Sequence, residues 1–175
     1  KCRIVSDDQI QDIWSRILAG EANNPGSFSR KTVNLLADFD RETAQLFGTL
    51  CRFGWTIDGA FVPLVFDDAE DIYREYEMNT ITLSHLEAIG LAKSNGILGF
   101  SISSTSGSYV AAYGGDTVHL TLAESKRNKL DIGQVLLTPS GLQLSSIVER
   151  EPVTGFFEFV YDKWVNEALI SPRAG

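Results

Sequence analysis

The sequence predicts an α+β protein, in which an N-terminal helical subdomain packs on a winged-helix-like unit with a small antiparallel sheet and an aromatic C-terminal helix. Apolar residues recur at helical spacing in the first part of the chain. Alternation with a period of two begins at Ile97 and indicates strands. Between these regions the expected order is helix, short strand, helix, helix and hairpin, which is the order of a winged helix.

Three short helices are expected first. The stripe over residues 6–20 begins after Ser6, whose hydroxyl can cap the first turn, and ends at Gly20. A Pro-Gly turn leads to a second helix over residues 29–37, and Asp40 caps a third. The positions expected to face the core in the second and third helices are Val33, Leu36, Ala37, Ala44, Phe47, Leu50 and Cys51.

The pattern changes in the middle of the chain. Residues 59–66 form a β-like run, and Pro63 restricts this run to an edge strand or an extended connection. Two helices should follow, and the second should end at Gly90. The expected caps are Asp67 or Asp68 for the first of these helices and Thr80 or Thr82 for the second, which should bury Leu83, Leu86 and Ile89.

Strands are expected over residues 97–103, 108–113, 117–122 and 134–137. Residues 103–108 and 114–116 should form turn tips, and residues 124–133 a polar loop or a poor strand end. Thr138 and Pro139 then begin a helix, because a hydroxyl cap followed by proline is a typical start. Its buried positions should be Leu142, Ile147 and Val148, with Leu144 less clearly placed.

The last helix is expected over residues 154–169 and carries a broad aromatic face, formed by Phe156, Phe157, Val160, Trp164 and Val165. The pattern divides the chain into a helical subdomain, residues 1–57, and a winged-helix-like unit with C-terminal helices, residues 58–175. One continuous domain is the alternative.

The composition disfavours polyanionic partners. The formal net charge is −8 and the pI is near 4.7, so the field of the whole molecule repels nucleic acid and anionic membranes. A helix that reads DNA normally presents Arg, Lys, Asn or Gln, whereas this one offers Ser84, His85, Glu87 and Lys93. The strongest cationic cluster is Lys126, Arg127 and Lys129, which a solvated loop explains and for which a nucleic-acid contact is the alternative.

Cysteine usage and hydropathy indicate the compartment. Cys2 and Cys51 are the two cysteines, and we expect them to be free thiols in a reducing environment. No apolar run is long enough to span a bilayer and no signal peptide is visible, so we expect a cytoplasmic protein with no membrane contact. The chain starts at Lys1 rather than Met, and we therefore expect it to be a fragment of a longer protein.

We expect no catalytic, cofactor-binding or metal site. Ser84 and His85 are adjacent, so they point to different faces of a helix and do not form a nucleophile–base pair. Metal-ligand spacings and glycine-rich phosphate loops are absent from the sequence. Residues 67–71 are rich in carboxylates, but acidic residues at the start of a helix explain them more simply than a bound cation does.

The function that these features favour is a non-enzymatic interaction or oligomerisation module, with a protein or a second copy of the chain as partner. A nucleic-acid-binding winged-helix regulator is the alternative. The residues proposed for the interaction surface are Ser84, His85, Glu87, Lys93, Lys126, Arg127, Lys129, Phe156 and Trp164. The two aromatic residues enter this set because an aromatic face that does not fit inside becomes an exposed patch.

The sequence also resembles a bacterial family of uncharacterised proteins that share a domain of unknown function. The likeness is carried by W-x-x-I-L-A-G-E at residues 14–21, P-G-S-x-S at residues 25–29 and R-x-T-V at residues 30–33, and by the tail at residues 137–164. Thr43 departs from the pattern, which has Asp at this position. The resemblance implies no reaction. Similar helical modules in anti-phage and abortive-infection proteins suggest a role in phage defence.

Overall fold

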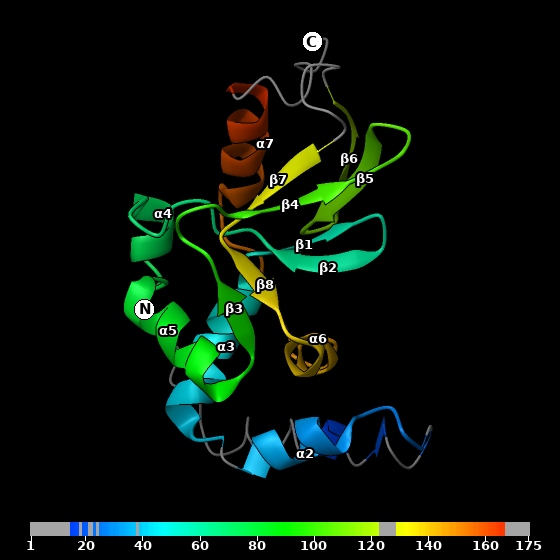
Figure 1. The fold of residues 1–175 in the computed structure, drawn as a ribbon, viewed down its shortest axis with the longest axis vertical. Helices are drawn as coiled ribbons and strands as arrows, with labels where there is room; N and C mark the ends of the chain where they lie inside the picture. The colour runs from blue at the N-terminus through cyan, green and yellow to red at the C-terminus, as the bar shows by residue number, and fades with distance from the viewer. Residues whose placement is uncertain are drawn as a thin grey trace.

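The computed structural model describes residues 15–17, 19, 20, 23, 25–37, 39–122 and 129–166. Helices and small antiparallel sheets make up this part of the chain, so the predicted α+β class is confirmed. In Figure 1, α2 and α3 lie toward one end of the molecule, and α7 lies toward the other beside the strands. Much of the first expected helix lies outside the described residues, and 15–17, 19, 20 and 23 are helical.

The element bounds follow the chain. The helices are α2 (Arg30–Ala37), α3 (Arg41–Arg52), α4 (Asp71–Arg74), α5 (Thr80–Ile89), α6 (Pro139–Ser145) and α7 (Phe156–Asn166). The strands are β1 (Gly54–Ile57), β2 (Ala60–Pro63), β3 (Ala92–Ser94), β4 (Phe100–Ser103), β5 (Ser108–Tyr113), β6 (Asp116–Thr121), β7 (Lys129–Gly133) and β8 (Val135–Leu137).

Several predicted helix ends are confirmed by their hydrogen bonds. The Asp40 side chain accepts from the Thr43 amide at 2.7 Å and caps α3. Thr138 caps α6 in the same way, and Gly90 ends α5 in the left-handed region with φ of 91°. Ala44, Phe47, Leu50 and Cys51 are all buried, as the α3 stripe predicts.

Other predicted caps are wrong. The N-cap of α5 is Asn79, whose side chain accepts from two amides of the first turn, and α5 begins at Thr80. Glu70 occupies the cap position of α4, while Asp67 accepts from the Ala69 amide in the preceding turn. The expected stripe of α6 is wrong at Leu142, which is 43% exposed, and Leu144 is buried in its place. Ile147 and Val148 pack against the core as predicted, although they lie just after the helix.

The largest sheet has four antiparallel strands in the order β2-β1-β5-β6. Strand β2 lies at its edge, as Pro63 predicts, whereas β1 was not expected from the sequence. The β1–β2 hairpin crosses the expected domain boundary between residues 57 and 58, and buried side chains from both sides belong to one core.

The strands after α5 do not pair with their neighbours in sequence. Strand β3 pairs with β8 and β4 pairs with β7, so that the β5–β6 hairpin is inserted between the two halves of a ribbon. Residues 104–107 therefore connect β4 to a strand of a different sheet, and they do not form the tip of a hairpin. Residues 97–99 are outside any strand, contrary to expectation.

Part of the order expected of a winged helix is present, but the hairpin expected directly after α5 is not, because β3 pairs with β8 and β4 with β7. Helix α3 is followed by the β1–β2 hairpin, an isolated bridge from Val65 to Gly133, and then α4, α5 and β3. The amide of Leu91 donates to the Leu86 carbonyl at 2.9 Å, and α5 therefore turns directly into the ribbon. Figure 1 shows α5 lying beside β3.

The core is apolar and rich in aromatic rings. Helix α7 packs Phe156, Val160 and Trp164 inward, and the rings of Phe53, Trp55 and Tyr73 meet them from the other elements. Burial of this area is the main favourable contribution to folding. Among the helices of the described residues, none has the length and apolar character needed to cross a membrane.

Candidate functional site

The outward face of α5 carries few of the expected contacts. Ser84 and Glu87 are exposed on α5, and Glu87 accepts a hydrogen bond from the Ser94 hydroxyl. Lys93 is exposed too, but it lies on β3 and not on the helix as predicted, because α5 ends at Ile89. His85 is half-buried and faces α3, where its Nε2 lies 3.1 Å from the Thr43 Oγ1. His85 is therefore occupied by a contact between helices, so it contributes little to an outward surface.

Two members of the expected surface are core residues, and the prediction that they form part of an exposed patch is wrong. Phe156 and Trp164 are both 0% exposed. Phe156 packs at 5.0 Å from the ring of Phe53, and the indole nitrogen of Trp164 donates to the Asp131 carbonyl at 3.1 Å. The reason is that Phe156, Val160 and Trp164 lie on the face of α7 that packs into the core.

The expected cationic cluster is only partly described. Lys129 is exposed at the start of β7, and Lys126 and Arg127 lie outside the described residues.

The most exposed large apolar side chains in the described part of the chain lie on the apolar turn, residues 95–99, between β3 and β4. Ile97 is 95% exposed and Leu98 is 85% exposed. The turn is ordered by its own hydrogen bonds, since the Leu98 amide donates to the Asn95 side chain at 3.1 Å and the Gly99 amide to the Asn95 carbonyl at 2.9 Å. Two aliphatic side chains are thus presented to solvent on a defined backbone.

A polar bridge ties this turn to the beginning of α5. The Asp68 carboxylate accepts from the Thr80 hydroxyl and from the Gln134 side chain. Gln134 in turn accepts from the Asn95 amide through its carbonyl, at 2.9 Å. Ile81, the residue after Thr80, is 82% exposed. These hydrogen bonds therefore connect the apolar turn to the start of α5, where Ile81 is a third exposed aliphatic residue.

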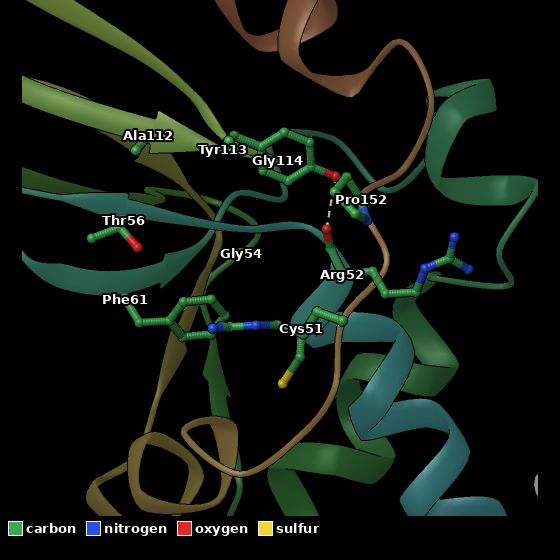
Figure 2. A pocket seen from close by; sticks show the side chains of 11 residues that line it. Cys51, Arg52, Gly54, Thr56, Phe61, Ala112, Tyr113, Gly114 and Pro152 are labelled. Atoms are coloured by element: carbon green, nitrogen blue, oxygen red, sulfur yellow. Dashed lines mark hydrogen bonds between the residues drawn. The ribbon is translucent and has the colours of Figure 1, made fainter.

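A hollow of about 240 Å³ lies where the end of α3, the β1–β2 hairpin and the β5–β6 turn meet the segment before α7. We call it the Arg150 pocket; its walls include Thr56, Phe61, Tyr113, Gly114, Arg150 and Pro152. The Arg150 guanidinium lies 4.2 Å from the centre of the Phe61 ring. Figure 2 shows the Tyr113 hydroxyl directed at the Arg52 carbonyl, to which it donates at 2.8 Å.

Two further residues of this pocket have settled roles. The Arg52 side chain extends away from Phe61 and Cys51 in Figure 2, and it donates to the Glu151 carbonyl at 2.9 Å. Burial raises the pKa of the Cys51 thiol to about 12, although the positive charge of Arg150 opposes this shift. Cys51 is free, as predicted, and it is a neutral thiol at physiological pH and a poor nucleophile.

Three carboxylates of the acidic segment at residues 67–71 have structural partners. Asp67 accepts from the Ala69 amide, Asp68 accepts from Thr80 and Gln134, and Asp71 pairs with Arg74. Within the described ranges, no group of three or more His, Cys, Asp or Glu side chains could hold a metal ion.

The P-G-S-x-S and R-x-T segments form a polar clasp between α2 and α6, made by Ser29, Thr32, Ser140 and Gln143. The hydroxyl of Thr32, which is 0% exposed, lies 3.0 Å from that of Ser140 and donates to the Gln143 side chain at 2.6 Å. The Ser29 amide donates to the same Gln143 oxygen at 3.1 Å. The motif therefore joins two helices that are distant in sequence.

Sequence reasoning missed the Arg150 pocket and the apolar turn. The pocket residues are scattered from Cys51 to Pro152 and share no spacing, so no linear pattern marks them. The turn was hidden by its composition, because Ile97 and Leu98 suit a strand. The signal available was Gly96 and Gly99, which flank the pair and are typical of a turn.

The helices and small antiparallel sheets define the class as an α+β protein. Comparison with family models gives a match over residues 1–160 to DUF2806, described as a protein of unknown function. The chain belongs to this family. No curated protein and no solved structure matches the chain.

Proposed function

We propose that the chain is a non-enzymatic protein-interaction or oligomerisation module, and that its contact surface is the apolar turn together with Ile81. The observation that carries this proposal is the exposure of Ile97 and Leu98 on an ordered turn. Burying one such side chain against a partner contributes roughly 1.5–3 kcal/mol. Isolated apolar residues are common on surfaces, but an adjacent pair on a fixed backbone is a better anchor for a partner.

The described chemistry supports a binding role over a catalytic one. His85 contacts Thr43, and the Cys51 thiol is buried and protonated, so neither is placed as a base or nucleophile for a bound substrate. His119 is exposed on β6, opposite Val110 of β5.

The charge of α5 supports a protein partner over a nucleic acid. Helix α5, with the sequence TITLSHLEAI, contains neither lysine nor arginine. Phosphate contacts supply most of the affinity of DNA-binding proteins, and this helix has no cation to offer them. The nucleic-acid-binding regulator therefore remains the alternative, and the experiment below includes it.

The biological setting is also proposed. The resemblance of the W-x-x-I-L-A-G-E and P-G-S-x-S segments to proteins of bacterial origin supports a bacterial source. Similar helical modules in anti-phage proteins support a role in phage defence.

The proposal is tested by replacing the two most exposed side chains, in the double variant Ile97→Ser with Leu98→Ser. Light scattering after size exclusion, over a concentration series, measures self-association. We expect the double variant to weaken dimerisation at least tenfold, which is about 1.4 kcal/mol. Leu142→Ser is the matched control, because Leu142 is also an exposed leucine but lies on α6.

If the chain is monomeric throughout, the same variants serve as baits for a partner protein. A partner captured by the wild-type chain and by Leu142→Ser, but lost with the double variant, supports the proposal. Equal capture by all three baits contradicts it. A salt titration with duplex DNA is the other arm, and tight binding that weakens as salt rises would favour the regulator instead.

A further inference from the structure

We propose that the Arg150 pocket binds a small ligand through an oxyanion group, either a carboxylate or a phosphate. This inference is independent of the interaction proposed for the apolar turn. It rests on an available cation, on walls that the backbone fixes, and on the charges that line the hollow.

The cation is Arg150. Its guanidinium stacks on the Phe61 ring at 4.2 Å, and within the described part of the chain it has no hydrogen-bond or ion-pair partner. Stacking engages only the face of the guanidinium, so the N–H groups on its edge are free to donate. Two parallel N–H donors match the two oxygens of a carboxylate or phosphate, and such charge-assisted bonds are the strong ones.

The aromatic anchor is held by a glycine. A Cβ on Gly54 would lie 1.9 Å from the Phe61 ring, so the absence of a side chain at this position lets the ring lie flat on β1. Phe61 is paired with Thr56 across the hairpin, which places the Thr56 hydroxyl beside the ring on the same face of the sheet. The ligand would therefore meet a prepositioned guanidinium and a hydroxyl.

The opposite wall is fixed as well. A Cβ on Gly114 would lie 3.1 Å from Pro152, so the β5–β6 turn and the segment before α7 are in close contact. The Tyr113 hydroxyl donates to the Arg52 carbonyl at 2.8 Å and accepts from the Val153 amide at 2.6 Å. These bonds fix the β5 end, the α3 end and the segment before α7 relative to one another, so little ordering is needed when a ligand enters.

Charge and size select the ligand class. The described lining contains neither aspartate nor glutamate, in a protein whose net charge is −8, and its cation is Arg150, since Arg52 directs its side chain to the Glu151 carbonyl. The volume of about 240 Å³ is below the range of roughly 300–1,000 Å³ that is typical of drug-sized ligands. The site therefore suits a ligand about as large as one amino-acid residue or a small phosphomonoester.

The test is an NMR titration of the ¹⁵N-labelled chain with inorganic phosphate and, separately, with acetate, at constant ionic strength set by sodium chloride. We expect saturable shifts of the Thr56, Gly114 and Gly115 amides with at least one of the two anions. Arg150→Gln should raise the dissociation constant at least tenfold, and Arg150→Lys should retain part of the affinity because it keeps the charge but loses the fork. Arg30→Gln, an exposed arginine on α2, is the control and should leave the affinity unchanged.

Saturation by phosphate alone assigns a phosphate-bearing ligand, and saturation by acetate alone assigns a carboxylate. Saturation by neither, or shifts that persist in folded Arg150→Gln, would overturn the proposal. If Arg150→Gln does not fold, Phe61→Leu decides the question, because it removes the stacking partner and leaves the charge. Unchanged affinity in Phe61→Leu would then be the contrary result.

Discussion

The aromatic core under α7 and the polar clasp between α2 and α6 both join segments that are distant in the chain, by different physical means. In the core, the ring centroids of Trp55 and Trp164 lie 5.3 Å apart, and both side chains are completely buried. In the clasp, Thr32, Ser140 and Gln143 meet through directional hydrogen bonds. Burial is roughly proportional to area and tolerates small shifts, whereas a hydrogen bond requires a defined geometry.

Stability and specificity therefore have different sources in this molecule. The core supplies most of the favourable free energy, because large aromatic side chains bury the most apolar area. The clasp contributes less to the free energy of folding, but it disfavours other placements of α2 on α6, since a misplaced helix would leave buried hydroxyls without partners. The motif that α2 carries is therefore a requirement of packing. These contacts give the motif a structural role and not a reactive one.

The largest effect on stability is expected for a substitution in the aromatic core. Trp164→Ala removes a fully buried indole and its hydrogen bond to Asp131, and should lower the free energy of unfolding by about 3–5 kcal/mol. Urea denaturation followed by circular dichroism measures this change. Glu158→Ala, at an exposed position of the same helix, should alter stability by less than about 0.5 kcal/mol. A loss of less than about 1 kcal/mol of unfolding free energy for Trp164→Ala would contradict the view that the core supplies most of the stability.

The clasp should show an intermediate effect. Thr32→Val keeps the shape of the side chain but removes the hydroxyl that meets Ser140 and Gln143, and should cost about 1–3 kcal/mol. Thr49→Val is the matched control, because Thr49 is half-buried in α3 and has no hydroxyl hydrogen bond in the described structure. A double-mutant cycle with Ser140→Ala should give a coupling energy clearly different from zero, and additive effects would refute a shared network.

The smallest effect is expected at an exposed helix cap, which neither the aromatic core nor the polar clasp supports. Asp40→Ala removes the cap of α3 and should cost about 1 kcal/mol at neutral pH. The hydrogen bonds from Thr43 hold the pKa of Asp40 below its ordinary value of 3.8. A lowered folded pKa means that the stabilisation is complete above the unfolded pKa and is lost as the pH falls through the folded one. The difference between wild type and variant should therefore shrink in acid, and a constant difference from pH 7 to pH 2 would exclude this cause.

Local features of the fold could be predicted from the sequence, and non-local pairings could not. Asp40, Gly90 and Thr138 act on groups within a few residues, so these residue types alone indicate where α3, α5 and α6 begin or end. The pairing of β4 with β7 depends on chain closure over the inserted hairpin, which no short pattern encodes. Periodicity also fails at single residues. Alternation placed Ile97 in a strand, whereas it is exposed in a turn, and helical spacing left Leu144 unplaced, whereas it is buried.

The candidate sites follow the same division. The absence of lysine and arginine from the ten residues of α5 can be seen in the sequence, because it concerns residue types alone. The stacking of Arg150 on Phe61 is not visible, because the two residues come together only when the segment before α7 lies over the β1–β2 hairpin. The exposed turn could have been suspected from its glycines, whereas its support by Asp68 and Gln134 required the fold.

The insertion of β5 and β6 into the ribbon has a consequence for the order of events on the ribosome. Strand β1 pairs with β2 as soon as both have emerged, but its other edge waits for Ala111 and Ala112. That edge is therefore open throughout the synthesis of α4, α5, β3 and β4, and an open strand edge invites pairing with other chains. Nascent chains of this protein should accordingly be most vulnerable to aggregation, and most in need of a chaperone, in the interval before β5 leaves the exit tunnel.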